Sequence, residues 1–395
     1  MSPLCESFRS LDQLDEMEAY YPLHALVCES CFLVQISQYV RPESIFREYA
    51  YFSSYSTSWL AHAERYCRMI TERLSLNRDS LVVELASNDG YLLQYFLKLD
   101  VPVLGVEPAV NVAKLAIDKG IPTRMEFFSR ALAEKMVADG TRADLIVGNN
   151  VLAQVPDLND FVSGMALLLK PEGIITLEFP HLLCLMESTQ FDTIYHEHFS
   201  YFSLNTVGRL VARHGLKLVD VDEISTHGGS LRVYLARSDS TFRPSAAVSA
   251  LLDREREYGL CDIATYSSFA TRVKRLKRSL LSYLIAVKDE GNVVCGYGAP
   301  GKGNTLLNYC GIGTDFLDFT VDRNPYKHGR FTPGMHIPIR RPEAIDEIEP
   351  NYILILPWNL KTEIIQQMRH VADWGGKFIV PIPHVEVIDP REALT

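Results

Sequence analysis

The sequence predicts an α/β protein with a parallel, doubly wound sheet, followed by a second α/β unit. Short apolar strands alternate with helices from residue 62 onward, which is the pattern of a parallel sheet. A second alternation begins near residue 293, after a charged helical region at 245–288. The chain has 395 residues, of which 47% are hydrophobic and 22% charged. It is therefore long enough for several cores, and its composition is ordinary for a soluble globular protein.

The expected elements follow this alternation. In the first unit they are helices at 62–74, from about 91 and at 158–169, with strands at 81–86, 101–106, 144–148 and 174–179. In the second unit they are strands at 293–298, 316–321, 352–356 and 378–381, with a short helix at 304–310. Residues 1–60 read as irregular. We therefore expect three domains, at 1–60, 61–240 and 241–395.

Charge and composition exclude several classes of protein. The formal net charge of −10 argues against a nucleic-acid partner. The basic run at 272–278 is expected to be the solvated face of a helix. No run of 18 apolar residues predicts a membrane span, and no basic segment followed by an apolar one predicts a signal peptide. The eight cysteines are scattered, which indicates reduced thiols and a cytoplasmic location.

The segment Thr193-Ile-Tyr-His-Glu-His-Phe-Ser-Tyr-Phe-Ser203 is the richest in chemistry. It supplies two imidazoles, a carboxylate and two phenols, all able to move protons or donate hydrogen bonds. Alone, it could form a metal site, a hydrolase site or a site that removes a proton from carbon. His196 and His198 could bind zinc from a strand, but H-E-x-x-H is absent and no third ligand motif is evident.

The turn after the first strand points to a nucleotide-like ligand. It follows an E-x-G-x-G-x-G spacing in which Ala86 and Asn88 replace two glycines and Gly90 remains. Glu107 ends the next strand, where an acid can accept hydrogen bonds from ribose hydroxyls. A diphosphate prefers glycines and no nearby negative charge, whereas this turn carries Asp89. The turn thus favours S-adenosylmethionine (SAM) over NAD, with an unliganded turn as the open alternative.

Seven segments, taken together, resemble one known family. They are Tyr49-Ala-Tyr-Phe-Ser-Ser-Tyr-Ser56, Glu84-Leu-Ala-Ser-Asn-Asp-Gly-Tyr91, Asn149-Asn-Val-Leu-Ala153, Thr193-Ile-Tyr-His-Glu-His198, His227-Gly-Gly-Ser-Leu-Arg232, Gly296-Tyr-Gly-Ala-Pro-Gly-Lys-Gly-Asn304 and Leu356-Pro-Trp-Asn359. They resemble, in order and over nearly the whole chain, the three-domain SAM-dependent C-methyltransferases that act on nucleotide-linked ketodeoxysugars in antibiotic biosynthesis.

The resemblance implies a fold and a cofactor site. It implies a Rossmann-like class I SAM methyltransferase domain, a second C-terminal Rossmann-like domain and a small irregular N-terminal remnant of a zinc ribbon. It also implies the residues that contact SAM, which are Glu84, Ser87, Asn88, Gly90, Glu107, Asn149 and Asn150. The partner implied is a nucleotide-linked sugar, with no nucleic acid and no membrane.

The resemblance places the catalytic groups in the run at 193–203. C-methylation requires a base that removes the proton next to a ketone and a donor that stabilises the enolate oxygen. We take His198 as the base and Glu197 as a group that orients an imidazole. Tyr195 would donate to the enolate oxygen, assisted by His196 or by Tyr51, which is also a candidate sugar contact.

The second glycine-rich loop could hold an anionic group. Residues 296–303 match G-x4-G-K, but glycine stands where a P-loop needs Ser or Thr for magnesium. A glycine loop with a lysine still suits an anion. By resemblance, Lys302, Asn304, Asn324 and Lys327 would face the nucleotide-sugar, and a pure domain-packing role is the alternative.

Two features depart from the family pattern. Cys28 and Cys31 have the spacing of half a four-cysteine zinc site, but no second C-x2-C exists in the sequence, and Cys5 and His24 are the available substitutes. Zinc is therefore expected only with an incomplete ligand set. Gln154 stands where the family usually has His, and it cannot carry a proton near pH 7. A non-catalytic SAM or nucleotide-sugar binding protein and an O-methyltransferase remain the alternatives.

Overall fold

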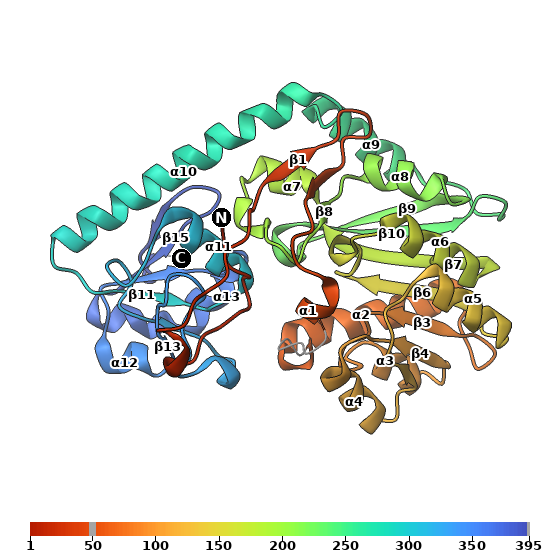
Figure 1. The fold of residues 1–395 in the computed structure, drawn as a ribbon, viewed down its shortest axis with the longest axis horizontal. Coiled ribbons are helices and arrows are strands. Elements are labelled where there is room, and N and C mark those ends of the chain that lie inside the picture. The colour runs from red at the N-terminus through yellow and green to blue at the C-terminus, as the bar shows by residue number, and fades with distance from the viewer. Residues whose placement is uncertain (47–52, 393–395) are drawn as a thin grey trace.

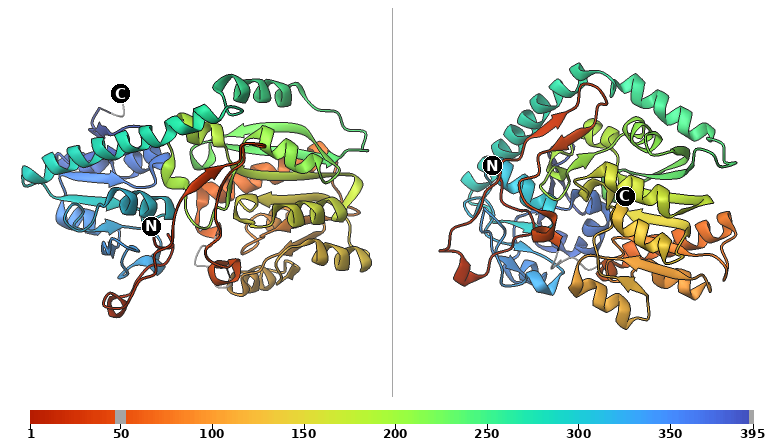
Figure 2. Two further views of the ribbon diagram at one scale, coloured as in Figure 1. Left: turned by 45° about the horizontal axis from the view of Figure 1, so that its top comes forward. Right: turned by 45° about the vertical axis from the view of Figure 1, so that its right-hand side comes forward.

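The computed structural model describes residues 1–46 and 53–392. Its described strands form a seven-stranded, a six-stranded and a three-stranded sheet. The two large sheets lie in separate α/β units, and the N-terminal segment runs between them (Figure 1). The helix α10 (Ile263–Asp289) leads from the first unit to the C-terminal unit and lies along the outside of the latter (Figure 2).

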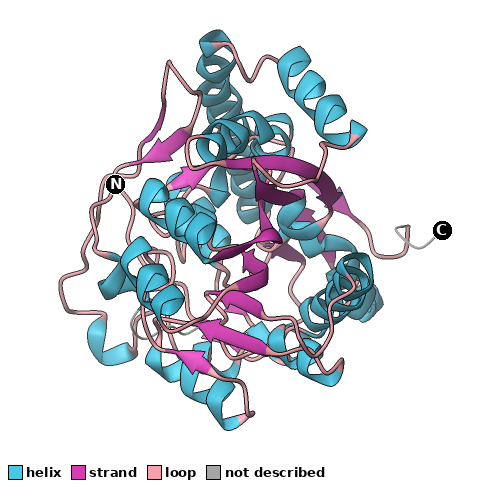
Figure 3. Cartoon of the chain, turned by 90° about the vertical axis from the view of Figure 1, so that its right-hand side faces the viewer, coloured by secondary structure: helices cyan, strands magenta, loops and turns pink. Residues whose placement is uncertain are grey.

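The seven-stranded sheet has the order β5-β4-β3-β6-β7-β10-β9. Its strands are β3 (Val82–Leu85), β4 (Val103–Val106), β5 (Thr123–Arg124), β6 (Ala143–Asn149), β7 (Leu169–Pro180), β9 (Leu216–Ile224) and β10 (Ser230–Arg237). Its helices are α2 (Thr57–Leu74), α3 (Leu93–Lys98), α4 (Val110–Asp118), α5 (Arg130–Ala138), α6 (Leu158–Leu168), α7 (Leu182–Glu187) and α8 (Leu204–Ala212). Helices cover both faces of the strands (Figure 3). This is the class I SAM methyltransferase arrangement.

The prediction of a parallel sheet is confirmed for β3 to β7, but the sequence predicted no strand at β9 or β10, and these two strands make the sheet mixed. Strand β10 pairs antiparallel with both β7 and β9. A tight turn containing η5 (Thr226–Gly228) joins β9 to β10. Such a short connection permits only antiparallel pairing, because a parallel pair needs a crossover of a dozen or more residues.

The six-stranded sheet has the order β13-β12-β11-β14-β15-β16. Its strands are β11 (Val294–Tyr297), β12 (Thr320–Val321), β13 (Ile339–Arg340), β14 (Tyr352–Ile355), β15 (Lys377–Val380) and β16 (Glu386–Ile388). Counted along the chain, this is the 3-2-1-4-5-6 order of a Rossmann fold. Only β16 is antiparallel to its neighbour. The helices of this unit are α11 (Gly301–Cys310), α12 (Ala344–Ile348) and α13 (Lys361–Gln367).

Helices α9 (Ala246–Tyr258) and α10 connect the two units. The buried side chains of α10 recur at helical spacing, and they are Val273, Leu276, Leu280, Leu284 and Val287. Lys274, Arg275 and Arg278 are exposed, which confirms the solvated face predicted for the basic run. Among the described residues, no helix is long and apolar enough to cross a membrane.

The N-terminal segment is more regular than predicted. Strands β1 (Ala25–Val27) and β2 (Val34–Ile36) form a hairpin, and α1 (Pro42–Phe46) follows. The third strand of this sheet is β8 (Ser200–Tyr201), which comes from the run at 193–203. The period-2 signal was too short to detect, since each strand has at most three residues. The hairpin therefore fixes one end of the predicted catalytic run.

Candidate active site

The turn after β3 keeps a glycine-like backbone without its glycines. Ala86, Asn88 and Gly90 have φ values of 56°, 49° and 76°, all left-handed. Asn tolerates this conformation, whereas Ala adopts it at a cost. At Gly90 an added Cβ would lie 2.3 Å from Ile121 Cδ1. The turn thus follows the path of the glycine-rich loop whose spacing it shares.

Several polar groups are buried at the carboxyl ends of β3 and β6. Glu84 and Ser87 are fully buried, and Ser87 Oγ has no hydrogen-bond partner in the described structure. Both side-chain polar atoms of Asn149 are also buried and unpartnered there. Unpaired buried polar groups are costly and rare. Burial and the nearby Glu107 raise the pKa of Glu84. These residues fit a polar, uncharged or cationic ligand such as SAM.

Glu107 is held in place at the end of β4. Its Oε2 accepts the backbone N–H of Asn88 at 2.9 Å and its Oε1 accepts that of Ala109 at 2.8 Å. Each carboxylate oxygen retains a second lone pair for a ribose hydroxyl. The Asp89 carboxylate lies 3.5 Å from Lys119 Nζ, which offsets the negative charge noted in the sequence. Asn150, just after β6, has a left-handed φ of 55°.

The predicted catalytic run at 193–203 is a buried loop after η4 (Phe191–Thr193). His198 Nδ1 lies 3.2 Å from the Thr193 carbonyl, so it donates, which leaves Nε2 as the acceptor for the Tyr195 hydroxyl at 3.1 Å. Burial, assisted by the charge of Lys302, lowers the pKa of His198 to about 4. The imidazole is therefore neutral, with its lone pair on Nε2.

The other two members of the run face the N-terminal segment. His196 Nε2 donates to the Pro22 carbonyl at 3.1 Å. Glu197 Oε1 accepts from the Cys5 thiol at 3.5 Å. Burial and the nearby Glu6 raise the pKa of Glu197 to about 8. His196 and Glu197 therefore bond to the N-terminal segment, whereas Tyr195 and His198 bond to each other.

The C-terminal unit brings Lys302 to this loop. Lys302 Nζ donates to Asn359 Oδ1 at 2.8 Å and lies 4.8 Å from the centre of the Trp358 ring. Trp358, in η7 (Trp358–Leu360), donates to Asp192 Oδ2 in η4 at 2.7 Å. Burial raises the pKa of Asp192 to about 6 and lowers that of Lys302. Asp192 went unnoticed in the sequence, because a single Asp carries no motif.

The other candidate sugar contacts of the C-terminal unit bond to protein groups outside the loop at 193–203. Asn304 Nδ2 donates to the Cys5 carbonyl at 2.6 Å, and Asn324 Oδ1 accepts the backbone N–H of Tyr326 at 3.0 Å. Lys327 Nζ donates to the Ala299 carbonyl at 2.8 Å and lies 3.7 Å from Glu6 Oε2. These contacts are of the domain-packing kind. Tyr51 lies outside the described residues.

The α11 N-terminus, where an anion was expected, faces a protein carboxylate. An added Cβ on Gly301 would lie 3.2 Å from Glu6 Oε1. The backbone N–H of Gly301 and the charge of Lys327 both oppose the rise that burial causes in the pKa of Glu6. Glu6 therefore occupies the position that a phosphate would take at this helix end.

A second polar cluster was missed by the sequence reasoning. His62 Nε2 lies 2.9 Å from Glu178 Oε2, and Arg232 Nε donates to Glu178 Oε1 at 2.7 Å. Glu178 is the register partner of Asn149, so the cluster lies beside the expected methyl donor. His227 belongs to the same region, since the charges of His198, Lys302, Glu178 and His62 all act on its pKa. In the sequence, the segment 227–232, one of the seven that carry the family resemblance, pointed to this cluster.

Gln154 ends η3 (Leu152–Gln154) and is half-buried. The neighbouring Ala153 carbonyl accepts the backbone N–H of Phe199 at 2.7 Å. The residue that departs from the family pattern is therefore next to the catalytic loop.

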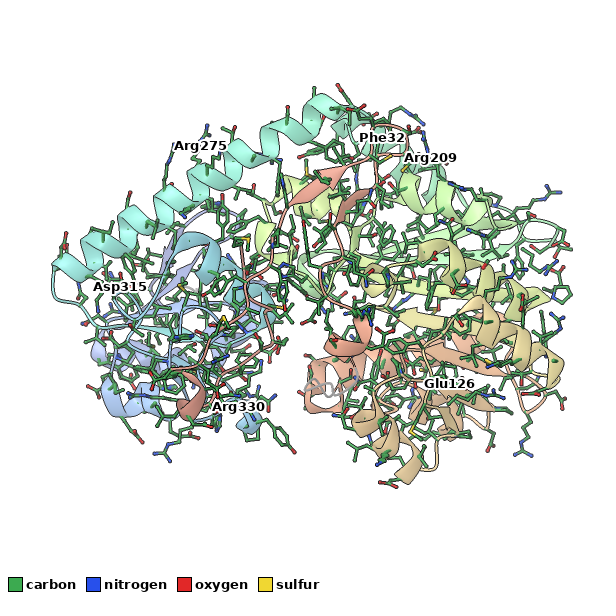
Figure 4. All side chains as sticks on the ribbon, in the orientation of Figure 1. Phe32, Glu126, Arg209, Arg275, Asp315 and Arg330 are labelled. Carbon is green, nitrogen blue, oxygen red and sulfur yellow. The ribbon has the colours of Figure 1, made fainter. Side chains whose placement is uncertain are left out.

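The described residues do not fit a zinc site. Cys28 and Cys31 lie in the β1–β2 turn, and the backbone N–H groups of Cys31 and Ser30 lower the pKa of Cys28. Within residues 1–46 and 53–392, no group of three or more His, Cys, Asp or Glu side chains could hold a metal. The turn is instead attached to α8, where Arg209 donates to the Ser30 carbonyl at 2.8 Å and stacks near Phe32 (Figure 4).

Comparison with known families gives three matches along the chain. Residues 1–46 match a family described as "Putative zinc binding domain". Residues 59–221 match a methyltransferase domain. Residues 225–383 match a C-methyltransferase C-terminal domain.

Individual relatives agree with these matches. C-methyltransferase NovU of Streptomyces niveus is 37% identical over 377 residues, covering 95% of this chain and 90% of that protein. A ubiquinone biosynthesis O-methyltransferase of Bartonella bacilliformis is 26% identical over 95 residues, covering 24% of this chain and 38% of that protein. Among solved structures, magnesium protoporphyrin IX methyltransferase from Synechocystis PCC 6803 with bound SAM is 14% identical, with a TM-score of 0.35 over 46% of this chain and 81% of its own.

Proposed function

The chain belongs to the C-methyltransferase family and is a SAM-dependent C-methyltransferase, and we propose that it methylates the carbon next to the ketone of a nucleotide-linked ketodeoxysugar. The observation that carries the proposal is the protonation and hydrogen bonding of the His198 imidazole. Its Nδ1–H is fixed by the Thr193 carbonyl, so its basic lone pair is on Nε2, where the Tyr195 hydroxyl caps it in the free protein. O-methylation would not require such a group so strongly, whereas proton removal from carbon does.

The proton transfer uses this chain's own side chains. His198 Nε2 accepts the proton from the carbon beside the ketone. The C–H electron pair forms the enolate double bond, and the carbonyl π pair moves onto oxygen. Tyr195, which caps Nε2 in the free protein, turns its O–H toward that oxygen when the sugar enters. His198 later returns its proton to solvent.

The low pKa of His198 in the free protein also fits a substrate sugar that carries negative charge. The charge of Lys302 helps to lower that pKa. An anionic nucleotide-sugar near Lys302 would compensate this charge, so the basicity of His198 would rise on substrate binding. A neutral imidazole at rest is ready to accept a proton at any pH above its pKa.

The methyl donor would lie against the turn after β3. Glu84, Ser87 and Asn149 would bind its amino-acid and nucleoside parts, with Glu107 on the ribose. When bound, SAM supplies an electrophilic methyl group, and the electrons of its S–CH3 bond pass to sulfur as the enolate carbon attacks.

Deuterium exchange tests this proposal. A panel of 4-ketosugar nucleotides is incubated with the protein in D2O, first without SAM and then with labelled SAM. We expect exchange of the hydrogen next to the ketone and label in a new C–CH3 group. Label found only on oxygen would favour an O-methyltransferase. SAM binding with neither exchange nor transfer would favour the non-catalytic binding protein.

A further inference from the structure

His227 is held in a conformation that the fold alone does not need. Its φ of 58° is left-handed, and Gly228 and Gly229 follow with φ values of 93° and 116°. A non-glycine residue in this region is strained, and such strain concentrates at functional sites. A glycine would serve the turn better if only its shape mattered.

The turn around His227 is fixed from two sides. An added Cβ on Gly228 would lie 2.6 Å from Trp358 Cη2, so the C-terminal unit closes directly onto the turn. Gln190 Nε2 donates to the Gly228 carbonyl at 2.7 Å. From α2, the Trp59 ring meets the His227 ring edge to face, with centroids 5.6 Å apart. The imidazole therefore has one defined position.

The position lies within the charged groups of the proposed site. His198 and Lys302 act on His227 from the catalytic loop and from α11, and Glu178 and His62 act on it from β7 and α2. Burial and the Lys302 charge together lower the pKa of His227 to about 3. The ring is thus neutral at any pH at which the protein works, and it serves as a hydrogen-bonding group and not as a base.

The ring nitrogens differ in their surroundings. Nδ1 is buried and has no hydrogen-bond partner in the described structure. A buried N–H without an acceptor is rarer than a buried acceptor without a donor. The residue as a whole is only half-buried, so we place the proton on Nε2, at the open edge of the ring. A neutral imidazole that donates to a carbonyl is a known electrophile for enolisation.

We infer that His227 is a further catalytic residue, whose Nε2–H contacts the sugar and donates a hydrogen bond to the oxygen that becomes the enolate. The inference rests on the proposed function. Tyr195 supplies one donor, but its hydroxyl is shared with His198 Nε2 in the free protein. His227 provides a donor that needs no rearrangement before proton removal begins, as a preorganised oxyanion site requires.

His227→Gly separates this role from a structural one. Glycine relieves the left-handed φ, so the unfolding midpoint should stay the same or rise, and the Kd for SAM should not change. We expect kcat for proton exchange and for methyl transfer to fall together by about 10²–10³, the usual effect of losing one oxyanion donor. His227→Asn, which tolerates the same φ and keeps an N–H donor, should recover part of both rates.

Ser75→Gly is the matched control. Ser75 is exposed at the end of α2 with a φ of 52°, so this change relieves the same kind of strain without removing a site group. It should leave both rates unchanged. Wild-type rates in His227→Gly would overturn the inference while the proposed function stands. A wild-type protein that neither exchanges nor methylates any ketosugar nucleotide would overturn both.

Discussion

Glu197→Gln measures how strongly the N-terminal segment acts on the loop at 193–203, the predicted catalytic loop. The Glu197 carboxyl is buried against the Cys5 thiol and near Glu6, and its pKa is raised from 4.5 to about 8. At neutral pH the folded protein keeps this group protonated, whereas the unfolded chain releases the proton. Folding therefore binds a proton, and stability is lost as the pH rises from the unfolded pKa through the folded one.

The rise in the pKa of Glu197 sets how much the free energy of unfolding changes with pH. A difference of about 3.5 units at 1.36 kcal/mol each gives an upper limit of about 5 kcal/mol, of which about 4 kcal/mol falls between pH 5 and pH 8.5. Gln has the shape of the protonated acid and does not titrate. The variant should match the wild type in free energy of unfolding at pH 5 and exceed it by several kcal/mol at pH 8.5.

Urea unfolding at the two pH values, followed by tryptophan fluorescence, provides the assay. Glu257→Gln is the control, since Glu257 is exposed on α9 and its removal deletes the same charge. Because that control keeps Glu197, it should lose stability between pH 5 and pH 8.5 by the same amount as the wild type. The reasoning is refuted if Glu197→Gln keeps the wild-type pH dependence, or if it is less stable than the wild type at pH 8.5.

Three further predictions concern the proposed site and the N-terminal cysteine pair. His198→Asn should reduce proton exchange and methyl transfer by about 10²–10⁴ while SAM binding persists, and retained turnover would remove His198 from the role of base. Asn149→Ala removes a buried polar group placed for SAM and should weaken SAM binding by about 1–3 kcal/mol in calorimetry, whereas an unchanged Kd would place the ligand elsewhere. Metal analysis of the purified protein should find less than about a tenth of a zinc per chain, because tight structural binding needs more ligands than Cys28 and Cys31, and a full equivalent would contradict this.

The sequence could predict the elements that carry a strong local pattern. Strands β3, β4, β6 and β14 lie within a residue or two of their expected bounds, because buried parallel strands read as short apolar runs. The left-handed turn after β3 was also predictable, since its spacing survives the loss of two glycines. The alternation of strands and helices did not reveal the antiparallel hairpin of β9 and β10, because its turn carries no distinctive sequence signal.

The candidate site was only partly predictable, because its groups come from distant parts of the chain. The run at 193–203 supplied Tyr195 and His198 as neighbours in sequence. Nothing local indicates that Glu197 turns away to Cys5, or that Trp358 reaches Asp192 across 166 positions. Such contacts depend on how the units dock, and a single sequence does not encode docking in any short motif.

Docking of the N-terminal segment and the C-terminal unit against the loop at 193–203 changes the pKa values of the groups there. The catalytic loop has almost no regular structure of its own, and it is held by the β2 hairpin strand, the Cys5 segment and the Trp358 turn. Each of these contacts buries a titratable group, and burial changes its pKa in the direction that removes charge. His198 and His227 thereby stay neutral, Glu197 stays protonated, and Lys302 supplies the positive charge beside them. Separation of the C-terminal unit would admit water and return these groups to their ordinary pKa values. The proposed proton-transfer site should therefore exist only in the docked protein, because its acid–base groups come from both α/β units and the N-terminal segment covers Glu197.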